Sequence, residues 1–146
     1  MNLIISHNIA HRLYKNKIPI LPALLKVFQF LVYNSSVPAS VAIGKGSFFA
    51  YKGIGVVIHA RVKIGSDCTI GQGITIGGRS KKENVPVIGN RVYLGAGCRV
   101  LGDIVIGNNV IIGPNAVVID NVPSNCIVVG VPARIVKREI KYDDFI

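Results

Sequence analysis

Three histidines, His7, His11 and His59, are the side chains of this chain best suited to exchange a proton near neutral pH. His7 and His11 lie four residues apart, a spacing that would place both on one helical face, where they could bind a metal ion. No Asp or Glu precedes Asp67 to complete such a site, so we expect a solvent-facing or interface pair and no metal. His59 is therefore the candidate general base, which would remove the proton from a hydroxyl group.

A six-residue repeat surrounds His59 and organises most of the chain. In each unit an aliphatic residue comes first, glycine usually follows it, and the fifth residue is small or β-branched. An amphipathic helix would need apolar residues three and four apart, so this period argues against helices. It predicts short strands forming three-sided coils that stack around a continuous core, and it disfavours an ordinary β-sandwich. The first residues of the units are Ile43, Ile58, Ile64, Ile70, Ile76, Ile88, Leu94, Val100, Ile106, Ile112 and Val118.

The repeat also predicts where particular residues lie. The glycine after each aliphatic residue is expected to take a corner conformation that a Cβ would make costly. Fifth residues such as Cys68 and Cys98 would point inward as small hydrophobic groups, out of reach of a substrate. Since three six-residue sides make one coil, position 59 stacks beside position 77, which places His59 next to Gly77 and Gly78.

Two segments break the period. Its continuation through residues 79–86 would turn Lys82 inward, where burial of an unpaired charge is costly, so we expect an extruded loop. Long loops on a regular scaffold commonly carry function. Residues 49–57 number nine where six or twelve would keep the register, so the coil is expected to bulge there.

The 146 residues are expected to form one compact unit with three parts. Residues 1–34 would form a helical cap, with helices at 2–15 and 22–33, that shields the open edge of the first coil. Residues 35–131 would form the solenoid. Residues 132–146 would form a C-terminal tail that leaves the solenoid and adopts a short helix.

Composition narrows the setting and the partners. The longest apolar run, residues 18–33, is too short and too interrupted to span a membrane, and no signal-peptide pattern precedes it. Three cysteines without metal-ligand spacing favour a reduced, cytoplasmic setting over a disulfide scaffold.

Positive charge is concentrated in the N-terminal part of the chain. The formal net charge is +10, and the first 66 residues carry eight basic residues and no acidic one. Such a field favours anionic partners: phosphorylated cofactors, acidic glycans or lipid headgroups. No nucleic-acid partner is expected, because helix-turn-helix, zinc-finger and aromatic RNA-binding signals are missing. Peripheral contact of the basic N-terminus with a membrane is left open.

The repeat resembles the left-handed parallel β-helix of the bacterial hexapeptide acyltransferases. Residues 70–78 (IGQGITIGG), 85–89 (VPVIG), 94–97 (LGAG) and 130–136 (GVPARIV) are similar to the serine acetyltransferase branch of that family. Residues 14–22 are similar to short members encoded among polysaccharide biosynthesis enzymes. The resemblance implies a mainly β fold, transfer of an acetyl group from acetyl-CoA to a hydroxyl group by a histidine base, and a homotrimer with sites between neighbouring subunits.

A candidate acetyl-CoA site follows from the resemblance and from side-chain chemistry. The backbone at the two glycines would allow close approach of the thioester or pantetheine arm, and its N–H groups would stabilise an oxyanion. Basic side chains would bind the phosphates of CoA, for which the arginine fork is well suited. The candidate cofactor-binding residues are Gly77, Gly78, Arg79, Ala96, Arg134 and Lys137, with Lys81 and Lys82 as further cations.

The chain departs from the serine acetyltransferase pattern around the acceptor. The Asp-His pair of that branch falls nearest to Ala50 and Tyr51 here, its supporting aspartate near Ser36, and a second histidine near Val85. Without those carboxylates no binding site for a serine ammonium group is evident. We therefore expect the acceptor to be a sugar hydroxyl of a surface polysaccharide or its precursor.

His59 would replace the missing histidine as the catalytic base. A backbone carbonyl, Asp67, or Glu83 from the loop of a neighbouring subunit would orient its ring, and Tyr51 would hydrogen-bond to the acceptor. Two alternatives stay open: a small serine O-acetyltransferase, and a non-catalytic trimeric scaffold that shares the fold.

Overall fold

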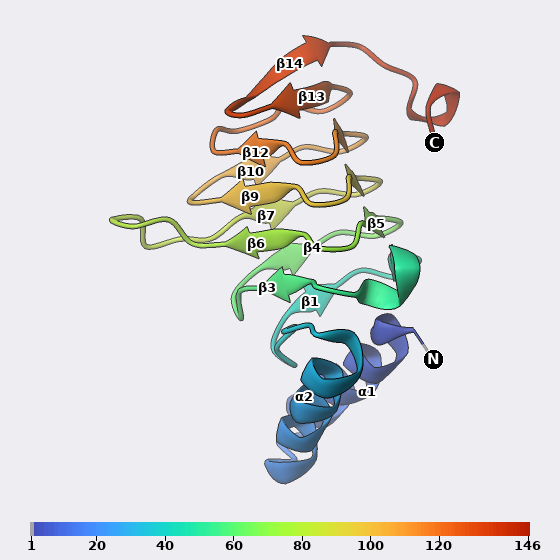
Figure 1. The fold of residues 1–146 in the computed structure, drawn as a ribbon, viewed down its shortest axis with the longest axis vertical. Coiled ribbons are helices and arrows are strands. Elements are labelled where there is room, and N and C mark those ends of the chain that lie inside the picture. The colour runs from blue at the N-terminus through green and yellow to red at the C-terminus, as the bar shows by residue number, and fades with distance from the viewer. Residues whose placement is uncertain (1) are drawn as a thin grey trace.

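A computed structural model describes residues 2–146 and shows two helices followed by a solenoid of short parallel strands (Figure 1). Helix α1 spans Leu3–Lys15, and its N-cap Asn2 accepts a hydrogen bond from the Ile4 N–H. Helix α2 spans Ile20–Tyr33, starting two residues earlier than predicted, because Pro22 fits the first helical turn without needing its missing N–H. Within the described residues, neither helix is long and apolar enough to cross a lipid bilayer.

The strands form three flat faces, each built from one side of successive coils. The β1 face contains β1 (Ala42–Ile43), β4 (Lys63–Ile64), β7 (Val87–Ile88) and β10 (Val105–Ile106). The β3 face contains β3 (Val57–Ile58), β6 (Thr75–Gly77), β9 (Arg99–Leu101) and β12 (Val117–Val118). The β2 face contains β2 (Phe48–Phe49), β5 (Thr69–Ile70), β8 (Tyr93–Leu94), β11 (Ile111–Ile112), β13 (Ile127–Gly130) and β14 (Ala133–Lys137). The predicted mainly β fold, a parallel β-helix with N-terminal helices, is confirmed.

The core consists of ladders of aliphatic side chains that stack from coil to coil. Ile58 pairs in register with Ile76, which pairs with Val100, and all three are buried. The three cysteines are free and buried within the same interior. Burial raises the pKa of the Cys98 thiol to about 12, because an apolar interior disfavours the thiolate.

The corner glycines are needed for a different reason than the one predicted. Gly71 does not adopt a left-handed conformation, but a Cβ there would lie 2.6 Å from the Leu94 carbonyl oxygen and 2.7 Å from the Ala96 nitrogen. The glycine therefore allows the backbones of adjacent coils to approach closely. Left-handed backbone occurs two residues later in the unit, where it is adopted by Gly73 and by non-glycine residues such as Asn115.

The predicted bulge takes the form of a short 3-10 segment, η1 (Ala50–Gly53), between β2 and β3. Tyr51 and Lys52 have left-handed backbone there, with φ of 48° and 64°. The bulge contacts α1, and the Asn2 side chain donates a hydrogen bond to the Phe49 carbonyl beside it.

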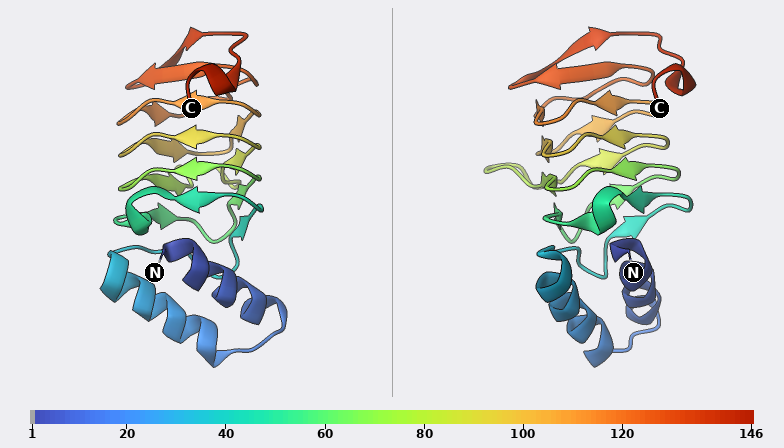
Figure 2. Two further views of the ribbon diagram at one scale, coloured as in Figure 1. Left: turned by 90° about the vertical axis from the view of Figure 1, so that its right-hand side faces the viewer. Right: turned by 45° about the vertical axis from the view of Figure 1, so that its right-hand side comes forward.

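The two N-terminal histidines attach α1 to the first coil. His7 is buried and its Nε2 donates to the Val41 carbonyl at 3.1 Å, while His11 Nδ1 donates to the Ala39 carbonyl at 2.7 Å. The expected solvent-facing pair is therefore wrong for His7. The helices pack beneath the first coil, at the end of the molecule opposite β14 (Figure 2). Within residues 2–146 no group of three potential metal ligands occurs.

The C-terminal tail forms a strand rather than the predicted helix. β14 pairs antiparallel with β13, the last strand of the β2 face. The open edge of β13 explains this outcome, because its unpaired backbone groups gain hydrogen bonds that a separate helix would not supply. The chain then descends along the β2 face to η2 (Tyr142–Asp144), where Arg91 pairs with Asp143 at 2.5 Å.

Candidate functional site

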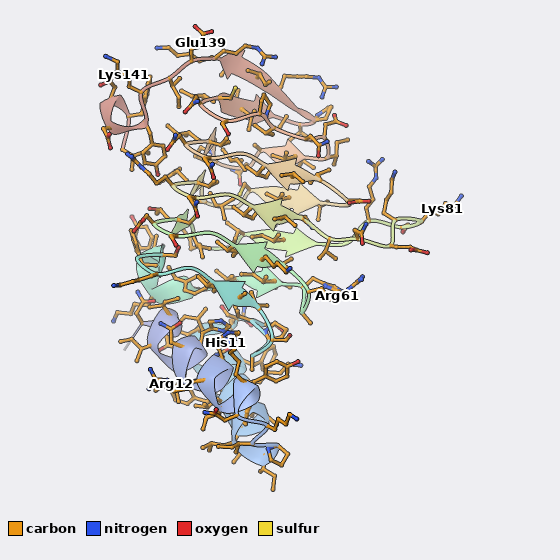
Figure 3. The ribbon with its side chains drawn as sticks, turned by 180° about the vertical axis from the view of Figure 1, so that it is seen from behind. His11, Arg12, Arg61, Lys81, Glu139 and Lys141 are labelled. Atoms are coloured by element: carbon orange, nitrogen blue, oxygen red, sulfur yellow. The ribbon has the colours of Figure 1, made fainter. Side chains whose placement is uncertain are left out.

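One corner of the solenoid carries the candidate base and the extruded loop. Here the chain passes from the β3 face to the β1 face, in four successive coils: residues 59–61, 77–86, 101–103 and 119–121. We call this column of residues the loop corner. The loop protrudes from it to the left in Figure 1, and Figure 3 shows Lys81 on the loop with Arg61 beside its base.

His59 lies directly beside Gly77 along the stack. Ile58 and Ile76 are in register, and the His59 N–H donates to the Ile76 carbonyl at 2.8 Å. In the next coil the Gly102 N–H donates to the Gly77 carbonyl at 3.0 Å. The six-residue period therefore predicted correctly that His59 and Gly77 are neighbours in adjacent coils.

The His59 ring is exposed and is held by its own turn. Its Nδ1 accepts a hydrogen bond from the Arg61 N–H at 3.2 Å. Because a backbone N–H can only donate, the neutral ring must carry its proton on Nε2. Among residues 2–146 no carbonyl or carboxylate bonds to this ring, so the orienting partners expected from the sequence are not seen within one chain. A base at this position must release the Arg61 N–H to free its lone pair.

Gly77 and Gly78 differ from the other corner glycines. A Cβ added at Gly77 would meet no atom within 4 Å, and one added at Gly78 would meet only Val85 Cγ1 at 4.0 Å. Coil stacking therefore does not require glycine at either position, in contrast to Gly71. The open space leaves the backbone accessible to a ligand beside His59.

The extruded loop is tethered at its base. Arg61 donates to the Glu83 carbonyl at 2.6 Å, and the Asn84 side chain donates to the Asp103 carboxylate at 3.1 Å. Glu83 thus approaches the turn of His59 through its backbone rather than through its carboxylate. Val85 is buried and anchors the end of the loop in the core.

Two hollows follow each other along the loop corner, away from His59. The first, of about 220 Å³, has mixed charge: Arg79 and Lys82 from the loop face Asp103 and Asp120. The second, of about 340 Å³, lies under β14, and Asp120 lines it as well. It holds Arg134 and Arg138, and the Arg134 guanidinium lies 3.6 Å from Asp120. These cations suit a ligand with several phosphates.

Four of the candidate residues lie away from the loop corner. Tyr51 and Ala96 are at the corner between the β2 and β3 faces, and Asp67 is at the corner between the β1 and β2 faces. Lys137 lies over the Phe145 ring, with Nζ 4.8 Å from its centroid. Within one chain the structure therefore brings together His59, Gly77 and Gly78, with Glu83 nearby. Arg79 and Arg134 lie further along the same corner.

Sequence reasoning missed Asp103, Asp120 and Arg138. The first two could have been found by continuing the coil stacking that relates His59 to Gly77 through two further coils. The position of Arg138 in the second hollow depends on the path of β14, and it was missed because the tail was expected to form a helix.

Comparison with known proteins places the chain among acetyltransferases of this fold. Residues 86–120 match the model of the bacterial transferase hexapeptide (six repeats) family. A serine acetyltransferase of Synechococcus elongatus is 40% identical over 137 residues, covering 92% of this chain and 56% of that protein. The serine acetyltransferase of Bacillus subtilis is 33% identical over 153 residues, covering 99% of this chain and 70% of that protein.

A solved structure shares the arrangement of strands. The serine acetyltransferase of Brucella abortus in complex with coenzyme A superimposes with a TM-score of 0.87 at 31% identity, covering 92% of this chain and 54% of that one. The chain thus spans between 56% and 70% of the length of the two curated relatives, and about half of the solved one.

Proposed function

The chain belongs to the serine acetyltransferase family of bacterial hexapeptide-repeat transferases, and we propose that it transfers an acetyl group from acetyl-CoA to a hydroxyl group. One observation carries the proposal: the open backbone at Gly77 and Gly78 lies beside an exposed histidine, on the same corner as the two hollows that contain Arg79, Arg134 and Arg138. We call these two hollows together the groove. An inert solenoid would have no need of glycine at these two positions.

The groove fits acetyl-CoA as the cosubstrate. Arg134 and Arg138 under β14, with Arg79 from the loop, would bind its phosphates. The reactive end would then lie along the loop corner toward Gly77. The coenzyme A bound to the Brucella abortus relative supports this assignment. Acetyl-CoA supplies the activated acetyl group, and the reaction needs no metal.

His59 is proposed as the base that takes the acceptor proton. Its Nδ1 becomes free when the ring turns away from the Arg61 N–H, which exchanges one exposed hydrogen bond for another and costs about 1 kcal/mol. Gly77 is the last residue of β6 and pairs with β9, so the Gly78 N–H, just beyond the strand, would stabilise negative charge that develops on the acetyl oxygen.

L-Serine is the acceptor best supported by the relatives described above, since each of these three is named a serine acetyltransferase. This differs from the sugar hydroxyl that the sequence led us to expect. The sequence argued against serine because no carboxylate was evident to bind its ammonium group. Asp103 weakens that argument, because it supplies a carboxylate at the loop corner between Arg61 and Lys82. Such alternating charge suits an amino acid, with the ammonium group at Asp103 and the carboxylate at either cation.

A sugar hydroxyl in surface polysaccharide biosynthesis is the second candidate. The positions nearest to the missing family residues hold no acid or histidine: Val85 is buried, and Ser36 forms a backbone bridge with Val57. An acceptor site without these groups would suit a neutral hydroxyl compound.

We also propose a homotrimer, as the resemblance implies. Tyr51, Asp67 and Ala96 occupy the two corners remote from His59, so only a neighbouring subunit would bring them to the loop corner. Tyr51 and Asp67 would then contact the acceptor, and Ala96 the pantetheine arm.

Release of free CoA thiol from acetyl-CoA, measured with L-serine and with a panel of nucleotide sugars and oligosaccharides, tests the activity and its acceptor. We expect turnover with L-serine. Turnover with a sugar alone would select the second candidate. No thiol release with any acceptor, although CoA binds, would favour the non-catalytic scaffold.

Three substitutions separate the possible roles of His59. In H59N the amide oxygen can still accept from the Arg61 N–H, and in H59Q the amide nitrogen can replace the Nε2 donor, but neither can take a proton. If His59 is the base, both should lose on the order of 10²–10⁴-fold in kcat, as should H59A. Wild-type kcat in H59N would show that His59 only accepts the hydrogen bond that holds its turn. Wild-type kcat in H59Q alone would show that His59 acts as a hydrogen-bond donor through Nε2 and not as a base. Light scattering at three times the 15.7 kDa chain mass would show that each variant assembles.

A further inference from the structure

Helix α2 lies at the end of the molecule opposite β14 (Figure 2), and its outer face is a large apolar surface. Most of its large side chains are between one-third and three-quarters exposed, with Leu31 at 75% and Ile20 at 70%. Proteins that remain as soluble monomers rarely expose so much contiguous apolar surface, so this face is expected to be covered. The exposed residues are Ile20, Leu21, Leu24, Val27, Phe28, Phe30, Leu31 and Val32.

The exposure follows from how α2 packs. The helix buries only the narrow side that carries Gln29 and Tyr33, against the rest of the molecule. Residues 20, 24, 27 and 31 are three or four apart and form a continuous ridge on the opposite side. A helix that served only to cap the first coil would need apolar residues on one side alone.

A rim of lysines borders this apolar face at the turn between the helices and beside the bulge. The rim consists of Lys15, Lys17, Lys26 and Lys52, and all four side chains are exposed. The ion pairs within residues 2–146 join Arg91 to Asp143 and Arg134 to Asp120, far from this rim. No Asp or Glu occurs in the first 66 residues to neutralise it.

Two apolar hollows beside the helices each have lysine at the edge. One, of about 360 Å³, lies between α2 and the bulge, with Phe28 and Val32 on its wall and Lys52 beside them. The other, of about 530 Å³, lies at the turn between the helices, where Lys15 and Lys17 flank Tyr14. Apolar walls with a cationic edge match the acyl and phosphate parts of a lipid.

A second copy of the chain, bound through the same face, is a poor occupant of this surface. Face-to-face contact would bring two cationic rims together without a carboxylate between them. An anionic lipid surface complements both features, because the apolar ridge would enter the boundary between headgroups and acyl chains while the lysines bind the phosphates. We propose that the outer face of α2 and its rim dock the protein on the surface of an anionic phospholipid membrane.

Docking on the surface agrees with the length of α2. Its 14 residues are too few to span a bilayer, but an interfacial helix needs only one apolar face. The loop corner runs along the solenoid above the helices, so it stays open to solvent when the helical end is on the membrane (Figure 1).

Flotation of the full chain with lipid vesicles tests the proposal. We expect binding to vesicles of phosphatidylglycerol mixed with phosphatidylcholine, little binding to phosphatidylcholine alone, and release by high salt. The double substitution L24Q/L31Q should lower the partition coefficient on the order of tenfold or more, because it removes apolar surface that enters the membrane. K17E/K26E should do the same by reversing the charge of the rim.

Matched controls use equally exposed residues at the other end of the molecule. V136Q and K141E should bind vesicles as the wild type does. All of these side chains are exposed, so unchanged circular dichroism and thiol-release activity are expected in each variant. Equal binding to neutral and anionic vesicles, or undiminished binding by L24Q/L31Q, would overturn the proposal. So would loss of an oligomer in L24Q/L31Q without any vesicle binding by the wild type, which would assign the face to a second copy.

Discussion

At the scale of single residues, His7 links the stability of the fold to pH. Burial lowers its pKa from 6.5 to about 4, because the interior disfavours the charged imidazolium and the neighbouring His11 adds to the effect, against the hydrogen bond to Val41. Between these two values the unfolded chain binds more protons than the folded one. The unfolding free energy should therefore fall as the pH drops from 6.5 toward 4, by roughly 3 kcal/mol in total.

Thermal unfolding measured from pH 7 to pH 4 tests this contribution. In H7Q the amide nitrogen can still donate toward Val41 but no longer titrates, so the decline in Tm should be shallower than in the wild type. H11Q should keep most of the decline, because burial of His7 is its main cause. Parallel curves for the wild type and H7Q would contradict the assignment.

The same scale shows what the sequence can and cannot provide. The position of His59 beside Gly77 could be predicted, because counting residues around a coil fixes which positions stack. The hydrogen bond from Arg61 to Nδ1 could not, because it depends on a side-chain rotamer. The buried hydrogen bond of His7 was missed for a related reason: a four-residue spacing indicates a shared helical face, but not which element covers it.

At the scale of elements, the stacking of coils should make the unfolding free energy more sensitive to substitution of some corner glycines than of others. In G71A the new methyl group would collide with backbone atoms of the next coil, which side-chain rotation cannot relieve. We expect G71A to lose about 1–3 kcal/mol of unfolding free energy. G77A is the matched control, because its Cβ would meet open space, and its loss should stay below about 0.5 kcal/mol.

Urea denaturation of the two variants measures this difference. Equal losses in G71A and G77A would show that corner conformation, rather than close approach of coils, sets the requirement for glycine. G77A should still raise the KM for acetyl-CoA, because the added methyl group would fill the space assigned to the pantetheine arm.

Elements at the ends of the solenoid were harder to predict than those within it. The inner strands can be predicted because every coil repeats the same six-residue period. β14 forms instead because it pairs with the free edge of β13. Residues 133–137 contain no such repeat, so only the geometry of the last coil shows that they form a strand. Arg138 reaches the groove as a consequence of that strand.

At the scale of the whole molecule, charge is distributed so that it should accelerate binding of acetyl-CoA. The chain has a formal net charge of +10, and the groove adds Arg134 and Arg138 locally. Such a field raises the encounter rate with an anionic cosubstrate, and salt screens it. If the proposed activity holds, kcat/KM for acetyl-CoA should fall on the order of tenfold between low and high salt, while kcat changes little.

Acetyl-dephospho-CoA, which lacks one phosphate group, and R138Q should both show a weaker dependence of kcat/KM on salt, whereas K141Q should retain the dependence of the wild type. A parallel fall of kcat would instead indicate that salt disturbs the assembly, and a constant kcat/KM would mean that the net charge has another purpose, such as the docking of the helical end on anionic lipid.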